Sequence, residues 1–149
     1  MLSIVHGTTG ALITSKIPNP FISIPLVLLS HYIEDRIPHW DVGQGLTHKK
    51  KSKKTAFLQE LFFDFPLSIV LVYFIFQAGQ PTLNWQAWLG WFVGLLPDFL
   101  EFPYLFLNMK FFPIKQLADF HSWVHRSTPN VFWGMLPQIL VILLVILLK

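Results

Sequence analysis

The sequence predicts an all-α protein, a polytopic integral membrane helix bundle of about four to five helices with an interfacial segment before the last helix. Its composition departs from that of soluble domains, because 53% of its 149 residues are hydrophobic and 13% are charged, against about 25% charged on average. Two segments, 55–77 and 130–149, are apolar and long enough for a hydrocarbon core, which takes roughly 20 helical residues. We expect a single membrane-embedded domain over residues 1–149.

Apolar runs and the prolines between them define the helices in order. Residues 3–16 and 20–36 are predicted as two short helices, separated by Pro18 and Pro20, because proline removes an amide donor and disfavours a helical residue before it. We expect these two helices to form a hairpin. The segment 103–123, broken by prolines, is expected to lie in the membrane interface. The later helices are expected at 55–77, 84–101, 115–126 and 130–148.

Lysines set the predicted orientation. Five lysines lie in the segment 48–54, and such clusters favour the cytoplasmic side of a membrane. The connection 78–84 carries no charge, as expected on the opposite face. We therefore expect a protein of the bacterial cytoplasmic membrane, with the lysine segment as a topology signal near anionic lipid and not as a nucleic-acid site. The absence of cysteine excludes disulfides and thiolate metal sites.

Side chains that ligate metals gather at one predicted membrane face. Several are spaced by three or four residues, which places both members of a pair on one face of a helix. Imidazole and carboxylate together suit zinc, manganese or iron, so we expect one or two divalent ions, with zinc as the first choice. The candidate metal ligands are His6, His31, Asp35, His39, Asp64, Asp98, His121 and His125.

Two of the carboxylates have a competing explanation. Glu60 and Asp64 interrupt a run of phenylalanine and leucine, and an unpaired carboxylate near the membrane interior is costly enough that it usually faces a partner or a cavity. That partner is either a metal ion or a basic side chain, Arg36 or Arg126, whose ion pair would hold helices together. His6 alone would more often be a packed histidine, and it is a ligand candidate only because of the other residues.

Three short elements point to a family. They are an early histidine in "HGTTGAL", the stretch "LLPDFLE" and the stretch "HSWVHRSTPN". They resemble elements of the small bacterial membrane-bound metal-dependent hydrolases of the YdjM-like type. Pro97 and Asp98 match the family's second element, and His125 and Arg126 match the start of its third. Glu101 stands one residue after the position of the family's second acid.

The stretch "HYIEDRIPHWD", residues 31–41, carries a second, local resemblance. It is similar to an element of zinc-dependent phospholipase C and related nucleases, in which histidine, tyrosine, aspartate, proline and histidine follow in this order. Together the two resemblances imply a metal-activated water that attacks an ester in a membrane-associated substrate.

We therefore expect a membrane-embedded metal-dependent hydrolase, acting on a phosphoester or on a lipid-like substrate such as a phospholipid at the cytoplasmic face. Glu60 or Glu101 would take a proton from water, and Arg126 would neutralise a phosphate. The alternative is a non-catalytic membrane protein that binds metal or uses the cluster for ion-paired helix packing. A transporter is disfavoured, because the outer halves of the third and last helices offer little that is polar besides Gln77 and Gln138. The sequence predicts no oligomeric state.

Overall fold

The computed structural model describes residues 1–44, 46 and 51–149, and each named element within them is a helix. The prediction of an all-α protein is therefore confirmed for this part of the chain. Residues 48–50 of the predicted lysine segment lie outside the described residues. The elements are α1 (Ser3–Lys16), α2 (Pro20–Arg36), α3 (Lys53–Gln59), the π-helical turn η1 (Glu60–Asp64), α4 (Phe65–Val72), the π-helical turn η2 (Tyr73–Gln77), α5 (Trp85–Leu107), α6 (Ile114–Val124) and α7 (Val131–Leu148).

Four of these elements, from α3 to η2, join into one continuous rod, Lys53–Gln77. With the rod counted as one, the described residues form six helices. Several helices begin at a side chain that accepts a hydrogen bond from a backbone N–H of the first turn, which satisfies an amide that a helix start leaves unpaired. The residues with this role are Asn19, Ser52, Asn84 and Asn130.

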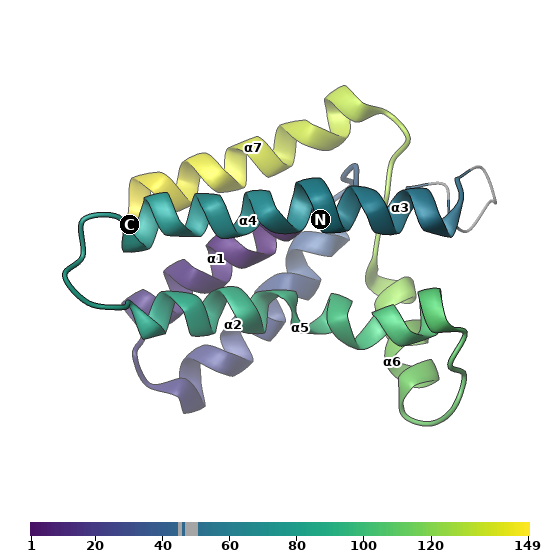
Figure 1. Ribbon diagram of the computed structural model, residues 1–149, viewed down its shortest axis with the longest axis horizontal. Coiled ribbons are helices and arrows are strands. Elements are labelled where there is room, and N and C mark those ends of the chain that lie inside the picture. Colours follow the sequence, from purple (N-terminus) through teal and green to yellow (C-terminus); the bar gives the residue numbers. More distant parts are fainter. Residues whose placement is uncertain (45, 47–50) are drawn as a thin grey trace.

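α1 lies in the centre of the bundle and contacts α2, α4, α5 and α7 (Figure 1). Its contact with α5 is the most extensive, because glycines face backbone there. A Cβ atom on Gly90 would meet the carbonyl of Gly10, and one on Gly94 would meet the carbonyl of His6. Small residues let helix backbones approach in this way. The antiparallel approach places Asp98, one turn beyond Gly94, at the amino-terminal end of α1.

The bundle has a polar interior and an apolar exterior. Its buried residues include nearly as many polar or charged side chains as apolar ones, whereas many large apolar side chains are exposed, among them Phe74 (65%) and Leu147 (81%). The rod and α7 are the two helices, among the described residues, that are long and apolar enough to cross a membrane. That result rests on length and composition alone, so insertion of the bundle in a membrane stays a prediction.

Candidate metal centre

The end of α2 supplies the first two ligand candidates. His31 and Asp35 lie one turn apart on α2, and both are fully buried. The helix ends shortly before Pro38, because the residue before a proline avoids the helical conformation. The chain then turns back, and the N–H of His39 donates to the carbonyl of Arg126 at 3.1 Å. His39 therefore reaches the same place without being helical.

Four side chains from three helices form the first group: His31 and Asp35 of α2, Asp98 of α5 and His121 of α6. One ligand atom from each lies within 4.8 Å of the others. Asp35 Oδ2 lies 2.8 Å from Nε2 of His121 and 3.4 Å from Nε2 of His31. Asp98 Oδ1 lies 3.7 Å from each of the same two nitrogens. Imidazole nitrogens and carboxylate oxygens are among the donors that zinc accepts.

The second nitrogen of each imidazole in this group faces an oxygen. Nδ1–H of His31 donates to the carbonyl of Gly94 at 2.8 Å, so Nε2 carries the lone pair, and it is buried without a hydrogen-bond partner. His121 Nδ1 lies 3.0 Å from Glu101 Oε2, without the geometry of a hydrogen bond. A hydrogen bond such as that of His31 orients a metal-binding histidine. Burial opposes protonation of His121, but Glu101 and Asp98 raise its pKa overall, so this position attracts positive charge.

Asp35 belongs also to a second group, with His39 and His125. The Nε2 atoms of the two histidines lie 3.0 Å apart, and Nδ1–H of His39 donates to the carbonyl of Ile37 at 2.8 Å. Asp35 Oδ1 lies 3.7 Å from His39 Nε2. Burial lowers the pKa of His39 to about 3 and that of His125 to about 2, so both imidazoles stay neutral, which is the form that binds metal. The two oxygens of Asp35 are thus divided between the two groups.

His6 lies beside both groups and belongs to neither. Its ring stacks on that of His31 with the centroids 3.8 Å apart. Its Nε2 lies 3.1 Å from Asp35 Oδ1 and 2.8 Å from the amino group of Met1. That amino group also pairs with Asp35 Oδ1, so a positive charge contacts the carboxylate that the two groups share. A ligand role for His6 stays a prediction.

Two acids near the centre have contacts that helical spacing does not reveal. Asp41 Oδ2 lies 3.7 Å from His39 Nε2 and 3.6 Å from His125 Nε2, and it is buried without a hydrogen-bond partner. Glu34 Oε2 lies 2.8 Å from His6 Nδ1. Asp41 follows the end of α2, so no helical periodicity connects it to the histidines. The signal in the sequence was its place within the dense run of polar residues from 31 to 41.

Glu60 and Asp64 lie against the start of α1. Asp64 accepts hydrogen bonds from the N–H groups of Ser3 at 2.7 Å and Ile4 at 3.3 Å, and Glu60 Oε1 accepts one from the Ser3 hydroxyl at 2.6 Å. α1 has no side-chain cap of its own, so Asp64 satisfies its first amides. They stand at the two ends of the π-helical turn η1. The predicted roles of Asp64 as ligand and Glu60 as proton acceptor stay predictions.

Within the described part of the chain, neither arginine forms an ion pair with an acid of the two groups. The backbone N–H of Arg126 donates to the backbone carbonyl of Asp35 at 2.9 Å, and the residue is exposed. The guanidinium of Arg36 donates to the carbonyl of Trp123 at 3.3 Å and lies 5.5 Å from the centroid of its ring. In the part of the chain that the structure describes, the ion pair between a lysine or arginine side chain and an acid is that of Lys115 with Asp119.

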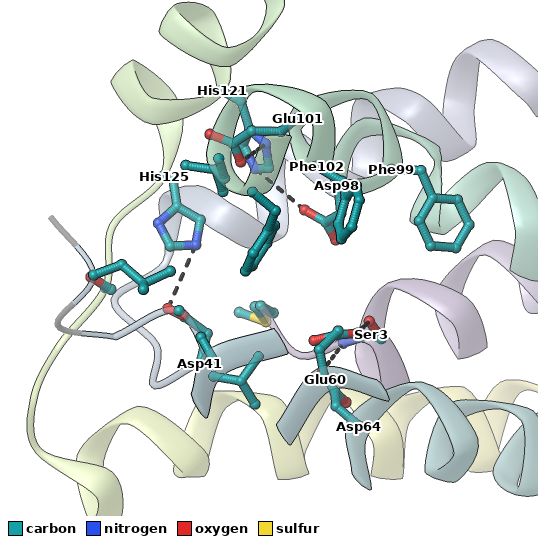
Figure 2. A pocket seen from close by; sticks show the side chains of 18 of the residues that line it. Ser3, Asp41, Glu60, Asp64, Asp98, Phe99, Glu101, Phe102, His121 and His125 are labelled. Atoms are coloured by element: carbon teal, nitrogen blue, oxygen red, sulfur yellow. Dashed lines mark hydrogen bonds and ion pairs between the residues drawn. The ribbon is translucent and has the colours of Figure 1, made fainter. Parts of the chain in front are cut away.

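A cavity of about 410 Å³ lies beside the two groups. Figure 2 shows Asp98 and His121 on one side of it, Glu60 and Asp64 across from them, and Asp41 with His125 at one end. A molecule in this cavity would therefore contact residues of both groups. The ionisable side chains that line it are Asp41, Glu60, Asp64, Asp98, Glu101, His121 and His125.

No protein-family model, no curated protein and no solved structure matches this chain. The similarity to YdjM-like hydrolases and to zinc-dependent phospholipase C therefore rests on short motifs and stays a prediction. Of the residues that carry it, Asp98 belongs to the first group and His125 to the second, while His31, Asp35 and His39 of the 31–41 stretch are divided between the groups.

Proposed function

We propose that this protein is a membrane-embedded, metal-dependent hydrolase that acts on a phosphoester or lipid-like substrate. One observation carries the proposal: Asp35 turns one carboxylate oxygen toward each of two groups of ligand candidates. Such a carboxylate is suited to bridge two divalent ions, and ions paired at about 3.5–4 Å are common in enzymes that hydrolyse phosphate esters. Zinc is the first choice because imidazoles supply much of the donor set, with manganese and iron as alternatives.

Different residues around the cavity would have different roles in this proposed reaction. Bound divalent ions would lower the pKa of water from about 15.7 toward 7 and polarise the ester oxygen. Glu60 and Glu101 both line the cavity and are the candidates to accept a proton from the attacking water. Arg126 does not line the cavity, so the divalent ions, and not Arg126, would neutralise the phosphate. One ion would be held by His31, Asp35, Asp98 and His121, and the other by Asp35, His39 and His125.

The surface of the bundle supports its insertion in a membrane. The rod and α7 are long and apolar enough to span, and large apolar side chains such as Phe63 (70%) and Leu140 (57%) are exposed on them. Soluble monomers rarely expose large continuous apolar surface. Together with the lysine-rich segment, this favours a bacterial cytoplasmic membrane with the candidate centre at its cytoplasmic face.

A non-catalytic role is the second candidate, and specific contacts favour it. His121 Nε2 lies within hydrogen-bond distance of Asp35 Oδ2, at 2.8 Å, and His6 Nδ1 within 2.8 Å of Glu34 Oε2. These contacts join α1, α2 and α6 without a metal ion. In this alternative the cluster would stabilise the packing of the helices, as buried charge pairs do when each group has a partner.

Elemental analysis of the detergent-purified protein separates the two candidates. We expect one or two equivalents of zinc, manganese or iron, loss of the ion of the first group in His121→Ala, and unchanged metal in Asp119→Ala, whose side chain is exposed and paired with Lys115. The metal-loaded protein should hydrolyse a chromogenic phosphodiester, and His121→Ala should not. A protein that takes up none of the three metals, even after reconstitution with each, would establish the packing role instead.

A further inference from the structure

The cavity beside the candidate centre has an apolar wall as well as a polar one. The polar wall begins on α5 with Asp98, and the same helix continues the lining with Phe102 and Phe106. These residues are spaced by four, so they lie on one face of α5. At 1.5 Å rise per residue, the face extends about 12 Å from Asp98 to Phe106. The remaining apolar lining is Met1, Val42, Leu46, Ala56, Phe99 and Leu105.

The opposite side of this wall comes from the rod. Ala56 is 1% exposed and lines the cavity one turn before Glu60. Next to it, Phe57 packs against Phe102 and against Phe106, with ring centroids 5.8 Å apart in both pairs. The aromatic contact holds α3 against the end of α5, and Ala56 lines the cavity between them. A larger side chain at this position would fill it.

The charges that line the cavity restrict what can enter. Among the described residues its lining holds five carboxylates and no lysine or arginine, although Met1, whose amino group pairs with Asp35, also lines it. A ligand with several negative charges, such as a nucleotide, would be repelled everywhere except where divalent ions neutralise it. A ligand with one small anionic head, placed at the proposed ions, avoids most of this repulsion, provided that the rest of it is uncharged. An aromatic and aliphatic wall favours hydrocarbon for that rest.

We propose that the substrate is a single-chain amphiphile, with a small phosphoester head at the candidate metal centre and a hydrocarbon chain along Ala56, Phe102 and Phe106. This inference rests on the proposed function, because it assigns the head to that centre. Hydrolysis would add one water across the P–O ester bond, leaving an alcohol and a phosphate without oxidation or reduction. Figure 2 shows Phe102 beside Asp98, where head and chain would meet.

Binding of alkylphosphonates tests the inference without turnover. The metal-loaded protein in detergent would be titrated with methyl-, butyl-, hexyl- and octylphosphonate by calorimetry. We expect affinity to rise roughly fourfold per added methylene, which corresponds to about 0.8 kcal/mol per buried CH₂, until the wall is filled. Ala56→Leu should abolish this rise and leave methylphosphonate binding and metal content unchanged. Ala78→Leu, at an exposed alanine outside the cavity lining, controls for a general effect of the added leucine, and a titration into detergent alone measures partition of the ligands.

The outcomes distinguish this inference from the proposed function. If affinity rose equally with alkyl chain length in wild type and Ala56→Leu, and both bound methylphosphonate, the hydrocarbon site would be overturned. The proposed hydrolase function would then still stand. Failure of the protein to bind metal and methylphosphonate would overturn the proposed function, and this inference with it. Phe102→Ala is a second variant: it enlarges the cavity, so it should weaken octylphosphonate binding severalfold while methylphosphonate binding stays the same.

Discussion

Replacement of Asp35 by asparagine tests the candidate centre most directly. Asp35 supplies one of four donors in the first group and one of three in the second, each through a different oxygen. Asparagine has nearly the same shape but offers one oxygen and no charge. Loss of a contact that merely orients a ligand costs roughly 10–100-fold in metal affinity. Loss of a ligand should reach at least the upper value, about 2.8 kcal/mol, for the ion whose oxygen is replaced, and the other ion loses the negative charge of its ligand.

The assay is metal content after equilibrium dialysis against zinc, together with affinity from competition with a chromophoric chelator. We expect wild type to hold two equivalents, His125→Ala to hold one, and Asp35→Asn to lose affinity at both positions. Asp119→Asn is the matched control, because it changes an exposed aspartate that pairs with Lys115. If Asp35→Asn kept both equivalents with wild-type affinity, the idea of a shared carboxylate would be refuted.

Three further predictions concern the surroundings of the centre. Glu101→Gln should weaken zinc binding roughly 10–100-fold without removing it, since Glu101 faces His121 Nδ1 at 3.0 Å. Chelator competition measures the zinc affinity, and an unchanged affinity would contradict the prediction. Gly94→Ala should lower the free energy of unfolding by about 1–3 kcal/mol, because its Cβ would meet the His6 carbonyl. Thermal unfolding measures this change. The comparison variant is Gly79→Ala, where a Cβ has open space but the positive φ adds strain. Asp64→Ala should lower the free energy of unfolding by about 0.5–2 kcal/mol, because α1 loses the carboxylate that accepts from its first amides. Metal analysis of the same sample tells whether Asp64 is also a ligand.

Helical spacing predicted the part of the candidate centre whose residues lie on regular helices. His31 and Asp35, four residues apart on α2, both belong to the first group. The same argument placed His121 and His125 together on one helix face, yet α6 ends at Val124 and His125 is already extended. The two histidines therefore fall in different groups. Spacing cannot anticipate where a helix ends when no proline or glycine marks the place.

Long-range contacts account for what the sequence could not reveal. Asp64 meets the amides of Ser3 and Ile4 across sixty or more positions of sequence, and nothing local indicates that pairing. Asp41 approaches His39 and His125 only because the chain turns back after α2. The all-α class, by contrast, follows from composition and apolar runs, which depend on local properties alone. Membrane insertion has the same local basis, and it stays a prediction.

The glycine contact between α1 and α5 corresponds to a short sequence pattern. Gly90, Gly94 and Asp98 repeat every four residues along α5, and His6 and Gly10 have the same interval on α1. The interval places a small residue at the helix contact and a ligand candidate one turn away. A search of genomes for G-x-x-x-G-x-x-x-D downstream of H-x-x-x-G and H-x-x-x-D would therefore recover distant relatives by the geometry they must preserve, even where the remaining sequence has diverged entirely.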